Sequence, residues 1–341
     1  MAIGKHRQVH LVGSIPLASS SEVFNTVSKH LGALVKRMPD GETGKRSLWI
    51  FGQTDWLRTT PNLAHSRDIP NANGIPMPVF RIRDRSQPVA FGPAGFAAAA
   101  QSSYAGFARL KRAGTIDAST RFMVALATPI ALVTAFIEPE DQEAVLREYQ
   151  KTIEAELKEI LDTIPHAELA IQWDVCVEIL ILEGIRRSPF GLSKADLLER
   201  VVHLTNLVPA TVEVGHHLCY GDLGHKHSVE PANLRLCVEI SRFIFAHAAR
   251  SIQWLHLPVP RSRKDDAYFA PIQELALPAG TELYLGLVHL TDGETGTRER
   301  MAVAEKYVSG FGIATECGFG RRPPQTVPGL LDIHAKAAAI Q

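Results

Sequence analysis

Two residues that bind metals well lie two positions apart at the end of one apolar run. His217 and Cys219 close a stretch that begins at Thr211. If this stretch is a strand, both side chains point the same way, so an imidazole nitrogen and a thiolate sulfur can reach one centre. Zinc takes such ligands tetrahedrally, and Cys317, at the end of the last apolar run, is the natural third donor. Three protein ligands leave one position for substrate. The alternative is that His217 and Cys219 only pack in the core, since His-x-Cys alone is a weak motif.

Other polar side chains also follow predicted strands. They are Ser14, Glu42, Asp174, His256 and His289, with Arg321 shortly after Cys317. Glu42 and Asp174 suit either amine binding and proton transfer, or pairing with a basic residue or capping a helix. Arg321 either holds a substrate carboxylate or lies in a solvated turn.

The remaining cysteines and histidines in these segments have simpler interpretations. We expect Cys176 and Cys237 to be small buried hydrophobes. His216 should face the helices that cover the sheet, because neighbouring residues alternate on a strand. His225 and His227 follow in a glycine-containing loop, for which solvation is the favoured interpretation.

These side chains need strands that end at one place. Eight short apolar runs are predicted as strands: residues 9–14, 34–35, 122–126, 169–174, 211–217, 251–256, 282–289 and 311–317. Helices are predicted between them, where apolar residues recur every three or four positions. The clearest helical stretches cover residues 141–161, 193–207 and 231–250.

Strands that alternate with helices are typical of parallel βα units, and eight of them predict one α/β domain over residues 1–341, a (β/α)₈ TIM barrel. Residues 59–120 are rich in Pro, Gly and Ala and are predicted as an insertion between the second and third strands, with a hairpin and one helix. The alternative is an open doubly wound sheet, but no Gly-x-Gly-x-x-Gly follows the first strand. In a barrel the active site lies at the carboxyl ends of the strands.

The composition argues against several classes of protein. The chain has 341 residues, 45% hydrophobic and 21% charged, with 36 basic and 36 acidic residues. Zero formal charge argues against a nucleic-acid binder, and no run approaches the ~18 apolar residues of a membrane span. Residues 1–10 lack the apolar run of a secretory signal. Four cysteines in this length form no disulfide framework. We therefore expect a cytoplasmic protein, whose neutral surface permits a homo-oligomer.

Several short strings at predicted strand ends occur in the order of one known family. They are Val12-Gly13-Ser14, Asp40-Gly41-Glu42, Ile171-Gln172-Trp173-Asp174, His217-Leu218-Cys219-Tyr220 and Glu316-Cys317-Gly318. Together they resemble the C-terminal catalytic barrel of cobalamin-independent methionine synthase, in the superfamily that includes uroporphyrinogen decarboxylase. The resemblance covers nearly the whole chain. It implies that Ser14 and Glu42 hold an amino acid, with Glu42 at its amine, and that Asp174 keeps the family aspartate's role. It also implies a Zn²⁺ site at His217, Cys219 and Cys317.

The chain departs from this family at several positions. The family has a glutamate zinc ligand on the sixth strand, whereas residues 252–258 carry none. His256, Glu294 or solvent is left as the fourth ligand. The tryptophan that stacks on folate has no counterpart near Thr134 and Ala135, and the family's N-terminal barrel is missing. Folate-dependent methionine synthesis is therefore not the expected reaction.

These features predict a zinc-dependent transferase that moves a methyl or alkyl group to or from a small thiol, held as zinc-bound thiolate. His289 or His256 would move the donor's proton, with Glu42 and Asp174 as further catalytic groups. One alternative is a metal-independent lyase or decarboxylase of the uroporphyrinogen decarboxylase type, which would use Glu42, Asp174 and Arg321. Another is a small-molecule binder without turnover.

Overall fold

The main element of the fold is a curled, seven-stranded parallel sheet. The computed structural model describes residues 6–71, 74–223 and 226–339. The strand order is β1-β4-β5-β6-β7-β8-β9, and every pairing is parallel. The strands are β1 (Arg37–Pro39), β4 (Arg121–Ala127), β5 (Leu169–Val175), β6 (Glu213–Leu218), β7 (Trp254–Pro258), β8 (Glu282–Val288) and β9 (Gly312–Thr315). This α/β architecture is consistent with a TIM-like barrel.

The first predicted strand lies between the two edges of this sheet. Val9 forms isolated parallel bridges with Val35, just before β1, and with Ile313 in β9. Its amide donates to Leu34 O at 2.8 Å, and the next amide, that of His10, donates to Ile313 O at 2.9 Å. The extended segment therefore pairs with β9 on one side and with the residues just before β1 on the other, although it is not itself a continuous strand.

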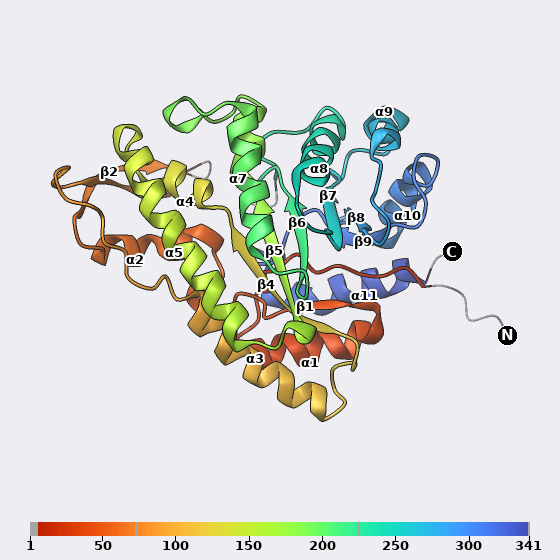
Figure 1. The fold of residues 1–341 in the computed structure, drawn as a ribbon. Coiled ribbons are helices and arrows are strands. Elements are labelled where there is room, and N and C mark those ends of the chain that lie inside the picture. The colour runs from red at the N-terminus through yellow and green to blue at the C-terminus, as the bar shows by residue number, and fades with distance from the viewer. Residues whose placement is uncertain (1–5, 72–73, 224–225, 340–341) are drawn as a thin grey trace.

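Helices cover the outside of the sheet (Figure 1). They are α1 (Ser20–Leu31), α2 (Thr54–Thr59), α3 (Phe96–Arg112), α4 (Pro129–Phe136), α5 (Gln142–Thr163), α6 (Val177–Leu182), α7 (Lys194–Leu207), α8 (Arg235–His247), α9 (Asp266–Phe269), α10 (Gly293–Ala304) and α11 (Val327–Ala338). The sequence pattern explains two of the helices that were predicted, α5 and α7. Val145, Tyr149 and Ile153 form part of the buried stripe of α5, and Ser193 caps α7 in a reciprocal capping box with Asp196.

No helix in the described part of the chain is long and apolar enough to cross a membrane.

The segment between β1 and β4 contains both a hairpin and a helix. Strands β2 (Leu63–Pro70) and β3 (Pro76–Ile82) pair antiparallel and form a separate two-stranded sheet, which lies away from the main sheet in Figure 1. Helix α3 packs against α1 and α5. It is therefore part of the helical layer, and the hairpin is the element outside the βα pattern.

The observed strand limits differ by a few residues from the predicted ones. The second strand covers Arg37–Pro39 rather than residues 34–35, and the sixth predicted run appears as Trp254–Pro258. The hydrogen-bonding partners on neighbouring strands fix these limits. Those partners are far away in the sequence, so local hydrophobicity does not determine them.

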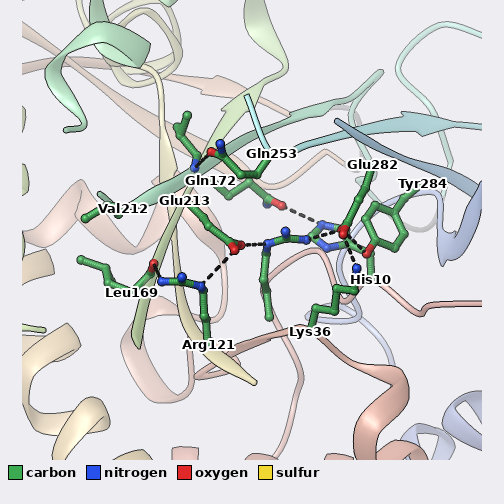
Figure 2. Close-up of polar contacts among 12 residues, drawn as sticks. His10, Lys36, Arg121, Leu169, Gln172, Val212, Glu213, Gln253, Glu282 and Tyr284 are labelled. Carbon is green, nitrogen blue, oxygen red and sulfur yellow. Dashed lines mark hydrogen bonds and ion pairs between the residues drawn. The ribbon is translucent and has the colours of Figure 1, made fainter. Parts of the chain in front are cut away.

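An ion-pair cluster closes the amino-terminal end of the sheet. Arg37 is 4% exposed and donates from Nε to Glu213 Oε2 at 2.5 Å and from Nη1 to Glu282 Oε2 at 2.8 Å. Arg121 Nε lies 3.0 Å from the other oxygen of Glu213. Figure 2 shows the two carboxylates of this cluster with Arg121, Lys36 and Tyr284 around them. Since each of these acidic and basic residues starts or precedes a strand, the cluster joins strands β1, β4, β6 and β8 at the end opposite the predicted site.

Candidate metal and substrate site

A small cavity lies at the carboxyl ends of the strands. It has a volume of about 50 Å³. Its lining includes most of the residues that the sequence singled out: Ser14, Glu42, Asp174, His217, Cys219, Cys317 and Arg321. Trp49, Cys176 and Asp222 complete its polar and aromatic walls. The side chains come from six separate segments, so the curled sheet brings together residues spread over some 300 positions.

Three potential metal ligands converge at this cavity. One ligand atom each of His217, Cys219 and Cys317 lies within 4.8 Å of the others. The two sulfurs are 3.8 Å apart. Zinc–sulfur bonds of about 2.3 Å at tetrahedral angles place two sulfurs about 3.8 Å apart, so the thiol pair has the spacing of a zinc site.

A chain of hydrogen bonds fixes the tautomer of His217. His256 Nε2 lies 3.0 Å from Thr315 O, and His256 Nδ1 lies 2.7 Å from His217 Nδ1. A carbonyl oxygen only accepts, so His256 Nε2 carries a hydrogen and His256 Nδ1 accepts one from His217 Nδ1. Burial lowers the pKa of both rings, that of His256 to about 3, which keeps both neutral.

His217 Nε2 is therefore left with a free lone pair. This atom is buried and has no hydrogen-bond partner. A buried polar atom without a partner costs free energy unless something binds it. Metal-bound histidines have this arrangement, because the ring nitrogen away from the metal donates to a protein acceptor. The three residues thus fit a zinc ion, because they offer nitrogen and sulfur donors, the two sulfurs have the spacing of zinc ligands, and the histidine has the tautomer that leaves Nε2 free to bind.

His256, predicted as a metal ligand, lies behind His217. Both of its ring nitrogens already have protein partners, and it does not line the cavity. Glu294, the other candidate for the fourth position, pairs with Arg298 on the same helix and is also absent from the cavity wall. The geometry gives neither residue a free donor atom at the cavity.

The two thiols are protonated in the absence of a cation. Contact with the Cys176 thiol and burial raise the pKa of Cys219, and contact with Cys219 and burial raise that of Cys317. Gly221 N donates to Cys219 Sγ at 3.2 Å, a contact that favours a charged sulfur. The thiols therefore need a positive charge to ionise near neutral pH, and a divalent metal supplies it.

Glu42 and Asp174 form a second polar group in the cavity. Burial and the nearby Asp174 and Asp40 raise the pKa of Glu42 to about 8, and burial raises that of Asp174 to about 7. Asp174 Oδ1 accepts from Gln172 Nε2 at 2.9 Å. Two buried carboxyl groups with raised pKa values bind a cation such as an ammonium well, because a cation stabilises their charged forms.

Glu42 adopts a backbone conformation that is rare outside glycine. Its φ is +49°, and its amide donates to Asp40 Oδ1 at 2.9 Å. Asp40 in turn accepts from Arg46 Nη2 at 2.6 Å. Strained backbone that surrounding contacts hold in place is concentrated at functional sites. Trp49, also on the cavity wall, has a φ of +55°.

The loop after Cys317 packs tightly on Ser14. Phe319 N donates to Ser14 O at 2.7 Å. A Cβ added at Gly318 or Gly320 would lie 2.5 or 2.7 Å from Ser14 Oγ, so both positions need glycine. Arg321, at the end of this loop, lines the cavity with its Nη1 3.5 Å from Asp222 Oδ2. Ser14 and Arg321 are therefore positioned by the same loop that carries Cys317.

His289, predicted as a proton carrier, is not on the cavity wall. It is 4% exposed, its Nε2 lies 2.9 Å from Val259 O, and its Nδ1 lies 3.6 Å from Glu316 Oε1. The other oxygen of Glu316 lies 3.1 Å from His227 Nε2. A buried acid between two histidines is thus the residue that precedes Cys317 in the chain.

The expectation that His227 is solvated was wrong, because its side chain is only 2% exposed. Its partner Glu316 is 89 positions away, so no local signal could show this pairing. His225 lies outside the described residues. His216 faces the helices as predicted and contacts Thr205 Oγ1 at 2.9 Å.

The two remaining cysteines differ. Cys237 is buried in α8 with its sulfur 3.7 Å from the hydroxyl of Tyr220, as expected for a packing residue. Cys176 is buried as predicted but also lines the cavity. The strand alternation that points His217 and Cys219 inward also applies from Asp174 to Cys176, and this signal could have identified it.

The fold has relatives of known structure. No protein family and no curated protein matches the chain by sequence. A B12-independent methionine synthase from Shewanella sp. W3-18-1, solved in complex with selenomethionine, matches with a TM-score of 0.66 over 98% of this chain and 97% of its own. A putative vitamin-B12 independent methionine synthase from Listeria monocytogenes matches with a TM-score of 0.54, over 96% and 95% of the two chains.

This chain has a methionine synthase-like fold. Sequence identity is 14% in both cases, so these comparisons establish the fold, while the chemistry of the site must be argued from the residues.

Proposed function

We propose that the chain is a zinc-dependent transferase that moves a methyl or alkyl group to or from a small thiol. The observation that carries the proposal is the convergence of His217, whose Nε2 has no hydrogen-bond partner, with the two sulfurs of Cys219 and Cys317 at one cavity. The likeness to methionine synthases in fold supports the same class of reaction.

The residues have separate roles in this proposal. His217, Cys219 and Cys317 hold the zinc, which keeps a substrate thiol deprotonated near neutral pH when bound. His256 is a positioning residue that fixes the ring of His217. His289 has no direct role in this proposal, because it does not line the cavity and contacts Glu316 instead.

The carboxyl groups and Arg321 suit a substrate with the polar groups of an amino acid. A substrate ammonium would lie between Glu42 and Asp174 and draw both into their charged forms. Ser14 and Arg321 also line the cavity and would supply a hydroxyl and a guanidinium for a carboxylate. We infer that the thiol substrate is a small amino acid of this type.

A larger hollow next to the cavity offers space for the alkyl donor. It has a volume of about 290 Å³ and shares Trp49, Cys176, Asp222 and Arg321 with the cavity. Phe51, Phe136 and Met77 are among its apolar lining residues. We propose that a donor other than folate enters here, because a mainly apolar wall that also carries two arginines, Arg186 and Arg321, and one acid, Asp222, favours an apolar group next to an anionic one.

We also propose that residues 9–14 complete an eight-stranded barrel in a single domain. The bridges of Val9 to Val35 and Ile313 support this closure. In this interpretation residues 59–120 are an insertion between the second and third barrel strands. The hairpin then extends the rim of the site, because Ile69 of β2 and Met77 of β3 line the larger hollow.

A metal-independent lyase is the second candidate. Glu42, Asp174 and Arg321 all line the cavity, and the two carboxyl groups have pKa values of about 8 and about 7. Groups with such values exchange protons efficiently near neutral pH.

Metal analysis separates the two candidates. We expect one equivalent of zinc in the purified protein, lost in Cys219→Ser and Cys317→Ser but kept in the matched control Cys237→Ser. We also expect alkyl transfer with a panel of small thiols to require the metal. A Cys317→Ser protein that is metal-free and fully active would contradict the zinc proposal and favour the lyase.

A further inference from the structure

The zinc site has three clear ligands, and the fourth position needs a donor. Zinc in proteins is almost always tetrahedral. Strand β7 carries no acidic residue, and His256 within it has both nitrogens engaged. Within the described residues the metal-binding group contains only His217, Cys219 and Cys317. A further donor must come from a side chain at the same cavity or from solvent.

Strand register places Cys176 beside Cys219. Strands β5 and β6 pair Asp174 with His217 and Val175 with Leu218. The hydrogen bond from Cys219 N to Val175 O at 3.1 Å closes this register, and Cys176 and Cys219 are the next residues after the two strands. Cys176 and Cys219 therefore lie on neighbouring strand ends of the sheet, at its carboxyl edge.

Side-chain direction and contacts agree with this register. Asp174 and Cys176 are two positions apart and both line the cavity, as do His217 and Cys219. Cys176 and Cys219 belong to one cluster of buried side chains, and Cys317 packs against it. Cys176 is 4% exposed, so its thiol faces this cluster and not solvent.

We infer that Cys176 is a fourth ligand of the zinc site, which gives the resting protein a centre of one imidazole and three thiolates. The inference rests on the zinc site proposed above. A thiolate is a stronger zinc donor than water and suits the apolar wall that Leu180 and Trp49 form around it. The unpartnered His217 Nε2 on the same cavity is the independent sign that a cation belongs there.

This assignment has a consequence for substrate binding. Catalytic zinc needs one position for its substrate, and Cys176 lies on the wall between the small cavity and the larger hollow. A substrate thiol that enters from the hollow therefore competes with Cys176 for the fourth position. The thiol specificity of the protein then depends on how well a substrate competes with this internal sulfur.

Sulfur counting tests the inference on the intact protein. In the cobalt-substituted protein, we expect the thiolate-to-cobalt charge-transfer absorption of Cys176→Ala to fall by about one third, because one of three sulfurs is lost. Zinc-edge X-ray absorption should give three sulfurs in the wild type and two in the variant. Chelator competition should show zinc affinity reduced by at least roughly 10-fold, the lower end of the effect of losing a supporting contact. The control Cys237→Ala should match the wild type in all three measurements.

The outcomes separate this inference from the proposed function. A wild-type protein with two sulfurs per zinc, unchanged in Cys176→Ala, would overturn the inference and leave the zinc transferase intact. A wild-type protein that binds no zinc or cobalt would overturn both. If Cys176→Ala folds poorly, Cys176→Ser replaces it, and the same loss of one sulfur is expected.

Discussion

At the scale of single residues, the site depends on one histidine tautomer. The hydrogen bonds from Thr315 O through His256 to His217, a residue that lines the cavity, leave a free lone pair on the buried His217 Nε2. The sequence predicted His217 as a metal ligand, but it could not predict which ring nitrogen carries the hydrogen. The acceptor that decides the tautomer is a backbone carbonyl on another strand, 98 positions along the chain.

His256 is therefore expected to control metal affinity without touching the metal. We predict that His256→Leu, which keeps the side-chain volume but removes the acceptor, weakens zinc binding roughly 10–100-fold. Chelator competition measures the affinity. The exposed His203→Leu on α7 is the control and should leave it unchanged. Wild-type affinity in His256→Leu would show that the His217 ring needs no such partner.

Glu42 is expected to make stability fall as pH rises. Its pKa is raised from 4.5 to about 8 by burial and neighbouring carboxylates. Between these values the unfolded chain releases the proton while the folded protein keeps it, so each rise in pH favours unfolding. Stability from this group is complete below pH 4.5 and is lost as pH approaches 8.

We predict that Glu42→Gln flattens this dependence in chelator-treated protein. Urea unfolding at pH 5, 6, 7 and 8 should give a smaller loss of unfolding free energy in the variant than in the wild type. Glu294→Gln, on exposed helix surface, should keep the wild-type slope. Identical slopes in the wild type and Glu42→Gln would contradict the burial of this carboxyl group.

At the scale of elements, strand ends position the site and loops complete it. Strand alternation predicted that His217 and Cys219 share a side, and β6 has them there. The same rule was not extended to Cys176, which was predicted only to pack. The buried pair of His227 and Glu316 could not be predicted, because it depends on two loops meeting in three dimensions.

The loop after β9 is expected to tolerate no side chain at Gly318. A Cβ there would lie 2.5 Å from Ser14 Oγ and 3.2 Å from Ser14 N. We predict that Gly318→Ala displaces Cys317 and costs roughly 1–3 kcal/mol of unfolding free energy. The affinity for zinc should fall as well, because Cys317 is one of the proposed ligands.

The matched control is Gly329→Ala in α11, where an added Cβ meets nothing within 4 Å. Alanine favours a helix more than glycine does, so this variant should be as stable as the wild type or more so. Urea unfolding and chelator competition measure both variants. A Gly318→Ala protein with wild-type zinc affinity would show that the loop does not position Cys317.

At the scale of the whole molecule, the two ends of the sheet have different roles. The carboxyl ends carry the cavity, and the amino ends carry the ion-pair cluster around Arg37. The sequence predicted the parallel α/β architecture because apolar runs alternate with helical stretches. It did not predict the cluster, whose members are distant in sequence and meet only when the sheet curls.

Arg37 is expected to affect stability and not the site. We predict that Arg37→Met lowers the unfolding free energy by roughly 1–3 kcal/mol, because Glu213 and Glu282 lose the hydrogen bonds of their buried cation and keep only Arg121 and Lys36 as ion-pair partners. Zinc stoichiometry of the folded variant should stay at the wild-type value. Lys158→Met, from an exposed pair on α5, should change stability by less than about 1 kcal/mol. Zinc loss in folded Arg37→Met would contradict the separation of the two ends.

The most direct test of the account is anomalous scattering at the zinc edge, measured on a crystal of the wild-type protein soaked with a small amino-acid thiol. We predict a single strong peak within bonding distance of His217 Nε2, Cys219 Sγ and Cys317 Sγ, with the soaked sulfur beside it and its ammonium between Glu42 and Asp174. A cavity with no zinc peak after zinc and thiol soaking, or a peak bound only by other residues, would contradict the central claim.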